Sequence, residues 1–471
     1  MIRLSVLLFT SLLLGSQPGL VTSQGWFKKM ASLARDTIQQ TTGSKDSLEG
    51  VPVVTLSNKE RCPLAGLGVG NMHPEVVPAM VAHSLKPDKN IRLFDTSNVS
   101  SNEENVARGI LDGTNQWLSE DGQDPSQVFE VHVITKVWYT HLGNNRTKIS
   151  VQSSLDALKP AMEHPNVDLK VHVMIHWPRC YDNIPWMDCE QEEANLPDEV
   201  KNAGPPPHLD KENAWKDSWR ALEEMYQDEN LKITSIGVSN FHLHELEELT
   251  KISKVKPHTM ETNAWSLLYD PKMIEFCHRN RIHLVAYHLM DSIIGHAETA
   301  PFAYHRILAI ANDLTKQMQE KGTLSEKDEL SAAQIVLAWL VQHKISVIPR
   351  TTDLFHLKEN AASSLFDIPA MTDTQVQTVA HAVEALIGGE DLTEDAFVQL
   401  TFHAKNKDIY LYWHDPENGG EIQIAKIDKG KSFVESSHPG HMFRIYDTET
   451  KENMETFQVE GKYGEHYHIE L

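Results

Sequence analysis

The most informative feature of this chain is the stretch Phe94-Asp95-Thr96-Ser97-Asn98-Val99-Ser100-Ser101-Asn102-Glu103-Glu104. A short apolar run from Ile91 to Phe94 ends here on a carboxylate, Asp95. Two later apolar runs end on Lys136 and on His176 in the same way. Titratable side chains at the ends of buried strands are typical of a site built on a rigid sheet. The sequence therefore predicts strands whose ends meet around a functional site.

Short apolar runs alternate with helix-period segments along most of the chain. One such segment is Trp215 to Tyr226, with apolar residues every three or four positions. The expected strands are Ala65–Val69, Ile91–Asp95, Val131–Lys136, Leu169–His176, Ile233–Val238, His258–Glu261, Ile282–Tyr287 and Ile345–Pro349. This rhythm predicts an α/β chain with a (β/α)8 TIM barrel. A doubly wound sheet is disfavoured, because Gly66-x-Gly68-x-Gly70 lacks the third glycine of a dinucleotide fingerprint.

In such a barrel the active face lies at the carboxyl ends of the strands. Besides Asp95, Lys136 and His176, five polar residues are expected there: Ser239, Asn240, Glu261, Tyr287 and Arg350. Seven of the eight expected strands end this way, which favours a site over chance.

The composition excludes several classes of partner. The chain has 471 residues, with Lys+Arg 43 against Asp+Glu 66 and a net charge of −23. Such acidity argues against nucleic acid or an anionic membrane as partner. The length leaves room for a large core and more than one domain.

The N-terminus is typical of a secretory signal over residues 1–23. Arg3 precedes the apolar stretch Leu4 to Leu14, and Val21-Thr22-Ser23 offers small residues for cleavage. The apolar stretch is short for a membrane span, with an uncleaved anchor as the alternative. We therefore expect a chain of the secretory pathway or the extracellular space, with a polar leader over residues 24–50.

Glycosylation and cysteine patterns fit that compartment. Asn98 and Asn145 each begin an N-x-S/T acceptor. Cys180 and Cys189 lie in a polar segment and are expected to form a disulfide, whereas Cys62 and Cys277 lie among apolar residues and are expected to be buried thiols. No cysteine or histidine pair has zinc-ligand spacing, so no metal site is predicted.

The sequence pattern changes near the C-terminus. After a barrel over residues 51–385, residues 386–394 are typical of a linker. Residues 395–471 alternate with period two, as in Ile409-Tyr410-Leu411-Tyr412-Trp413, which predicts a small all-β sandwich.

The barrel motifs resemble those of aldo-keto reductases. The resemblance covers residues 51–385 and follows the family order in Phe94-Asp95-Thr96-Ser97, Ile134-Thr135-Lys136, Ile175-His176-Trp177-Pro178, Ile236-Gly237-Val238-Ser239-Asn240-Phe241 and Val347-Ile348-Pro349-Arg350. It implies an NADP(H)-dependent oxidoreductase acting on small carbonyl compounds. In that family a tyrosine phenol protonates the alkoxide, a lysine paired with an aspartate lowers the pKa of the phenol, and a histidine orients the carbonyl. Asp95, Lys136 and His176 stand at three of these positions.

Ser100 stands at the tyrosine position of the resemblance. An alcohol is a far weaker acid than a phenol, so the resemblance implies a reaction that is weak or lost. Ser100 also completes the Asn98 acceptor, so a glycan there would stand at the mouth of the pocket.

The resemblance also assigns cofactor contacts. Ser239 and Asn240 match carboxamide contacts and Tyr287 the ring that stacks on nicotinamide, while Glu261 replaces a glutamine beside the carboxamide. Arg350 and Thr351 replace a lysine–serine pair at the 2′-phosphate, and Glu359 and Asn360 match adenine contacts. His288-Leu289-Met290-Asp291 departs from the family's phosphate loop.

The C-terminal module resembles the β domain of the von Hippel–Lindau tumour suppressor. Trp413, Ser437 and His441 match three positions of its hydroxyproline pocket. Two functions therefore remain open. One is a reductase with weak or lost activity. The other is a secreted non-catalytic barrel in which Asp95, Lys136 and His176 form only an ion network, with the β module binding a protein or a hydroxyproline-containing peptide.

Overall fold

The computed structural model describes residues 39–40, 48, 50–120, 123–388, 391–392, 398–414, 420–437, 441–459 and 466–471. The signal segment, most of the leader and part of the linker lie outside these residues. The chain divides into two compact units. One comprises the residues up to Leu289 together with Leu337–Ile368, and the other comprises Met290–Val336 and Pro369–Leu471. The domain boundaries drawn from the sequence stay predictions.

The first unit is built on a sheet of eight strands in the order β4 to β11. Every neighbouring pair is parallel. The strands are β4 (Leu67–Gly68), β5 (Leu93–Asp95), β6 (Phe129–Val137), β7 (Val167–Ile175), β8 (Ile233–Ser239), β9 (Thr259–Asn263), β10 (His283–Tyr287) and β11 (Ser346–Val347). All eight expected strands are present, and no boundary is shifted by more than two residues.

The two edges of this sheet meet. Ala65 forms a parallel bridge with Val347, and the Gly68 amide donates to the Pro349 carbonyl at 3.1 Å. A side chain at Gly68 would collide with the Ile348 carbonyl at 2.8 Å, so glycine permits this close approach. The predicted (β/α)8 barrel is confirmed. A small antiparallel sheet of β1 (Gln39–Gln40), β2 (Pro52–Thr55) and β3 (Arg61–Pro63) precedes it.

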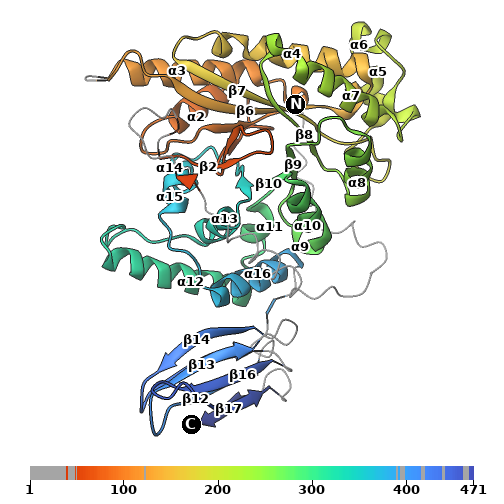
Figure 1. Cartoon of the computed structure of the whole chain (residues 1–471). Coiled ribbons are helices and arrows are strands. Elements are labelled where there is room, and N and C mark those ends of the chain that lie inside the picture. Colours follow the sequence, from red (N-terminus) through yellow and green to blue (C-terminus); the bar gives the residue numbers. More distant parts are fainter. Residues whose placement is uncertain are drawn as a thin grey trace. The chain divides into compact units, whose positions relative to one another are not determined.

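Helices cover the outside of the barrel. Figure 1 shows α3 (Glu103–Leu118), α4 (Asn144–Met162) and α7 (Ala214–Gln227) beside β6 and β7, and α4 contacts both of these strands. The other helices of this unit are α2 (Val77–Ser84), η1 (Asn98–Ser100), η2 (Tyr139–His141), α5 (Cys189–Ala194), α6 (Asp198–Asn202), η3 (Pro207–Leu209), η4 (Glu229–Leu231), α8 (Leu243–Ile252), α9 (Ser266–Tyr269), α10 (Pro271–Asn280), α14 (Leu354–Glu359) and α15 (Ala362–Phe366). Helix α13 (Ala332–Gln342) has residues in both units.

The barrel interior is packed in tiers. Its middle tier consists of five buried apolar residues, four in strands and one directly after β11, with Tyr287 against them: Leu93, Ile134, Met174, Val285 and Ile348. Strands β6 and β10 are not neighbours in the sheet, so their contact places this cluster inside the barrel. Because side chains alternate along a strand, the residues two positions before and two after each of these point into the same interior.

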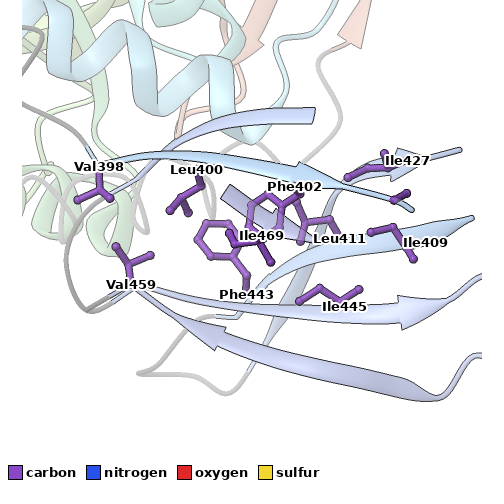
Figure 2. Packing of buried hydrophobic residues seen from close by; sticks show 11 residues of the cluster. Val398, Leu400, Phe402, Ile409, Leu411, Ile427, Phe443, Ile445, Val459 and Ile469 are labelled. Atoms are coloured by element: carbon purple, nitrogen blue, oxygen red, sulfur yellow. The ribbon is translucent and has the colours of Figure 1, made fainter. Parts of the chain in front are cut away.

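The second unit contains helices α11 (Asp291–Gly295), α12 (Pro301–Glu320) and α16 (Asp373–Gly388). It also contains two sheets, a mixed one of three strands and an antiparallel one of four strands. Sheet β15-β12-β18 comprises Ser432–Ser437, Val398–His403 and His466–Glu470. Sheet β14-β13-β16-β17 comprises Glu421–Ile427, Ile409–His414, Met442–Asp447 and Asn453–Gln458. Figure 2 shows Leu400 and Phe402 of one sheet against Leu411 and Phe443 of the other. Alternate residues of both sheets thus form one core, as predicted for a β sandwich.

Within the described ranges, no helix is both long and apolar enough to cross a bilayer.

Candidate active site

The carboxyl ends of the strands bring a lysine between two carboxyl groups. Lys136 at the end of β6 donates to Asp95 of β5, and its Nζ lies 3.1 Å from Oε1 of Glu261 on β9. Lys136 and Glu261 are almost fully buried, and Asp95 is 9% exposed. The resemblance predicted the pairing of Lys136 with Asp95, but it placed Glu261 beside the cofactor carboxamide. The structure shows that Glu261 also contacts the lysine.

Burial controls the charges of this group. Burial raises the pKa of Asp95, which the Lys136 ammonium opposes. Burial lowers the pKa of Lys136, but the carboxylates of Asp95 and Glu261 outweigh this and raise it. Burial and then the Asp95 charge raise the pKa of Glu261 to about 8. At neutral pH Lys136 is therefore charged and Glu261 is mostly protonated.

His176 directly follows β7 and faces the same end of the barrel. Burial and the Lys136 charge hold its pKa well below the ordinary value, so the imidazole is neutral at physiological pH. Its ring meets the edge of Trp138 with centroids 4.9 Å apart. Nδ1 of His176 and Oε2 of Glu261 are buried and have no hydrogen-bond partner among the described residues. Buried polar atoms are nearly always paired, so this end of the barrel is incomplete without a ligand or water.

Asn240 links three strand ends. Its Oδ1 accepts from the Tyr287 hydroxyl at 2.6 Å, while its Nδ2 donates to the His176 carbonyl at 3.0 Å and to Ser239 Oγ at 3.1 Å. The backbone of Asn240 has φ of 58°, in the left-handed region that asparagine tolerates better than most residues. Ser239, Asn240 and Tyr287 are thus held in one hydrogen-bonded network beside Glu261.

Ser100 ends the one-turn helix η1, which follows β5. Its Oγ lies 2.7 Å from Ser97 Oγ and shares a hydrogen bond with it. Neither of the Lys136 ion pairs involves Ser100, because Asp95 and Glu261 are the carboxylates that hold the ammonium. The local bond between two serines thus satisfies a hydroxyl at the position where the resemblance requires a phenol.

A cavity of about 400 Å³ opens beside the loop after β11. Arg350 and Thr351, both predicted to contact the cofactor, line it together with Asn71, Met72, His73, Thr352, Asp353 and His356. Asn71 and His73 were not among the predicted site residues, since they lie in a loop after β4, and a loop has no periodic sequence pattern. Glu359 ends α14 and Asn360 follows it, and neither is among the residues that line the cavity. An arginine and two threonines are donors suited to a phosphate group.

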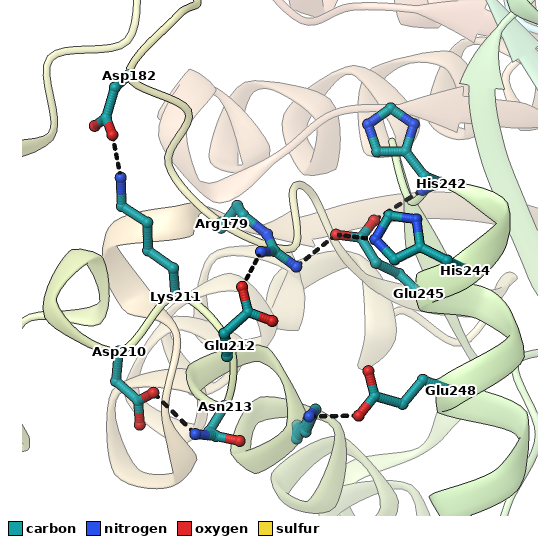
Figure 3. Close-up of polar contacts among 11 residues, drawn as sticks. Arg179, Asp182, Asp210, Lys211, Glu212, Asn213, His242, His244, Glu245 and Glu248 are labelled. Carbon is teal, nitrogen blue, oxygen red and sulfur yellow. Dashed lines mark hydrogen bonds and ion pairs between the residues drawn. The ribbon is translucent and has the colours of Figure 1, made fainter.

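The long segment after β7 is fastened at several points. Figure 3 shows Arg179 between Glu212 and Glu245, with nitrogen–oxygen distances of 2.6 and 2.7 Å. The structure joins Cys180 and Cys189 by a disulfide, with Cα atoms 6.0 Å apart. The fully buried Arg146 holds Glu193 of this segment, and Glu192 accepts a hydrogen bond from the Trp138 indole at 2.6 Å. Cys62 and Cys277 are buried free thiols, as predicted.

The two glycosylation acceptors are accessible to different degrees. Asn145 is exposed on α4, whereas Asn98 is half-buried on η1. Asn98 also lines a second cavity of about 190 Å³ together with Val99, Trp138, Thr140, His141, Glu192, Asn195 and Leu196.

In the β module, Ser437 Oγ lies 3.0 Å from His441 Nδ1, and the Trp413 and His441 rings meet edge to face at 5.7 Å. The structure thus places the three predicted pocket residues together. The segment between Ser437 and His441 lies outside the described residues.

A polar tier beneath the apolar middle tier was not anticipated from the sequence. His132 lies 3.0 Å from His172 and 3.1 Å from Glu130, and His172 lies 2.7 Å from Ser235. His283 shares a hydrogen bond of 2.7 Å with Ser346. The signal was available in the alternation Glu130, His132, Ile134, Lys136, whose members point into the same interior.

Comparison with known proteins agrees with this geometry. The model of the family described as "Aldo/keto reductase family" matches residues 65–383. A 9,11-endoperoxide prostaglandin H2 reductase of Trypanosoma cruzi is 28% identical over 309 residues, covering 65% of this chain and 84% of that protein. A glyoxal reductase of Bacillus subtilis is 28% identical over 319 residues, covering 67% of this chain and 87% of that protein.

Among solved structures, an aldo-keto reductase of Bombyx mori in complex with NADP has a TM-score of 0.50 at 20% identity. The match covers 70% of this chain and 92% of the Bombyx chain, and at this identity it shows the fold alone. The chain belongs to the aldo/keto reductase family.

Proposed function

We propose that this chain is an NADP(H)-binding aldo/keto reductase whose reduction of carbonyl compounds is weak or lost. The observation that carries the proposal is the set of partners that Lys136 and Ser100 have. The ammonium is held by Asp95 and Glu261, while Ser100 bonds to Ser97. The described contacts of Lys136 include no phenol, and general acid catalysis typically contributes ~10²–10⁴-fold to the rate.

The residues present fit the dinucleotide. Arg350 and Thr351 in the larger cavity supply donors for a phosphate. Asn240 and Ser239 supply amide and hydroxyl groups for a carboxamide, next to the Tyr287 ring. The unpartnered Oε2 of Glu261 can accept from an amide N–H. When bound, the cofactor supplies the hydride, and this chain's part is to hold it and to orient a carbonyl with His176.

Titration of the full chain with NADPH, followed by turnover of a panel of aldehydes, tests this proposal. We expect saturable binding with slow or undetectable turnover. Absence of binding at millimolar NADPH would overturn the assignment, and fast turnover by the wild-type chain would overturn the role given to Ser100.

A second candidate function concerns the β module. Ser437, His441 and Trp413 lie together, and this supports a pocket that recognises a hydroxyproline-containing peptide. The hydroxyl of hydroxyproline would hydrogen-bond to the serine–histidine pair while the ring packs on the indole. If this is the function, the chain is a secreted binding protein, and its barrel has no catalytic role.

A matched pair of peptides tests that function. A hydroxyproline peptide and its proline twin should differ in affinity for the full chain, and Ser437→Ala should remove the difference. Equal affinity of the two peptides for the wild-type chain would exclude the pocket.

The secretory location and the glycans at Asn98 and Asn145 also remain proposals. A glycan on Asn98 would stand beside the smaller cavity, because that asparagine lines it. Enzymatic removal of N-glycans from the secreted chain, read as a mass shift, checks both sites.

A further inference from the structure

Glu261 hydrogen-bonds to both members of the buried ion pair, Lys136 and Asp95. Its Oε1 lies 3.1 Å from Lys136 Nζ, whereas its Oε2 is buried without a hydrogen-bond partner among the described residues. Glu261 is 2% exposed and is the middle residue of β9, opposite Val285 of β10, the strand that ends in Tyr287. Glu261 also affects Tyr287 electrostatically: burial and then the Glu261 charge raise the pKa of the Tyr287 phenol.

The charges of the groups that face Glu261 cancel, so the net charge of the site depends on whether Glu261 is ionised. Lys136 and Asp95 form an ion pair and cancel each other. His176 is neutral because burial and Lys136 lower its pKa, and Tyr287 is neutral because its pKa is raised. Ser239 and Asn240 carry no charge. The described residues of the site therefore sum to zero when Glu261 is protonated and to −1 when it is ionised.

Resting on the cofactor site proposed above, we propose that Glu261 makes this barrel discriminate between the two redox forms of its cofactor. It binds NADP⁺ in preference to NADPH, and the preference grows as the pH rises. The oxidised nicotinamide ring is a pyridinium cation, whereas the reduced ring is neutral. An ionised carboxylate beside the ring attracts the cation, and in a buried site this attraction is poorly screened.

The pH dependence follows by linkage. The pKa of Glu261 lies at about 8 without the cofactor. A bound cation favours the ionised carboxylate and lowers this pKa, so NADP⁺ binding releases a proton and tightens with pH. If the pKa falls by one unit, the affinity for NADP⁺ rises about tenfold between pH 6.5 and pH 9. NADPH gains nothing from the ionised form. The phosphates are the same in both cofactors, so their titration cancels in the ratio of affinities.

Equilibrium titration of the full chain with NADP⁺ and with NADPH at pH 6.5 and pH 9, read by tryptophan fluorescence and calorimetry, tests the inference. We expect the ratio of NADP⁺ to NADPH affinity to rise about tenfold with pH in the wild-type chain. In Glu261→Gln the ratio should be independent of pH. Glu103→Gln is the matched control, because Glu103 is another buried carboxyl group whose pKa is raised by burial, but it bonds to Thr135 on the outer side of β6.

The outcomes separate this inference from the function on which it rests. Binding of neither form would overturn the proposed function itself. Binding of both forms with a wild-type ratio that does not change with pH would overturn only the inference about Glu261, and it does so without any variant having to fold. A pH-dependent ratio that persists in Glu261→Gln would assign the effect to another group and also overturn the inference.

Discussion

The barrel interior has a lower polar tier around His132 and His172 and an upper polar tier of Asp95, Lys136, His176 and Glu261. The two tiers differ in how many of their polar atoms have hydrogen-bond partners. The lower tier joins Glu130, His132, His172 and Ser235 in a continuous set of hydrogen bonds. The upper tier leaves His176 Nδ1 and Glu261 Oε2 without partners among the described residues. Unsatisfied buried groups cost stability and persist where a ligand completes them. The difference indicates that the lower tier serves the fold and the upper tier a ligand.

The largest expected effect concerns the acid that, in the proposed function, the upper tier lacks. Ser100→Tyr supplies a phenol next to β5, and we expect it to raise kcat for aldehyde reduction by ~10²–10⁴-fold. Because Glu261 competes with the new phenol for Lys136, the double variant Ser100→Tyr with Glu261→Gln should have a higher kcat than Ser100→Tyr alone. Steady-state kinetics with NADPH measures both. Ser100→Ala is the control, and an unchanged rate in both tyrosine variants would contradict the role given to position 100.

In the lower tier, removal of one member should damage the fold. His172→Ala leaves His132 and Ser235 buried without a shared partner, and we expect it to lower the free energy of unfolding by ~2–4 kcal/mol. Urea denaturation measures the loss. His278→Ala on the exposed face of α10 is the control, with an expected change within ~0.5 kcal/mol. A loss at His172 no larger than at His278 would break the comparison between the tiers.

The lower tier also predicts acid sensitivity. Burial lowers the pKa of His132 and His172, and it lowers the pKa of His283 to about 4. The unfolded chain binds protons below pH 6.5, whereas the folded chain does not until about pH 4 for His283. Stability is therefore full above pH 6.5 and falls toward pH 4, by at most about 1.4 kcal/mol per pH unit for each histidine. Denaturation at pH 7.5 and 5.0 tests this, and His283→Gln should flatten the slope.

The smallest effect is expected for the stability of a variant in the upper tier. Glu261→Gln removes a carboxyl group that is buried with one oxygen unpaired. We expect the free energy of unfolding to change by less than ~1 kcal/mol or to increase, as is common where a site sacrifices stability for function. A loss as large as that of His172→Ala would show that both tiers serve the fold.

The sequence predicted the barrel well because eight apolar runs alternate with helical segments, and it identified the strand ends that carry Asp95, Lys136 and His176. It could not show that Lys136 would also contact Glu261, since these residues are joined only by the curvature of the sheet. The histidine tier was not predicted, because His132 and His172 are single polar residues within apolar runs that still indicate strands. The cavity lined by Asn71, His73 and Arg350 depends on loops, whose course has no sequence period.

The most direct test of the account is a paired equilibrium titration of the wild-type chain and Ser100→Tyr with NADPH, with aldehyde turnover measured on the same samples. The account predicts saturable binding of similar affinity in both proteins and turnover that is strong only in the tyrosine variant. If neither protein binds NADPH, or if wild type turns over as fast as Ser100→Tyr, the claim that this barrel retained the cofactor site and lost its acid is wrong.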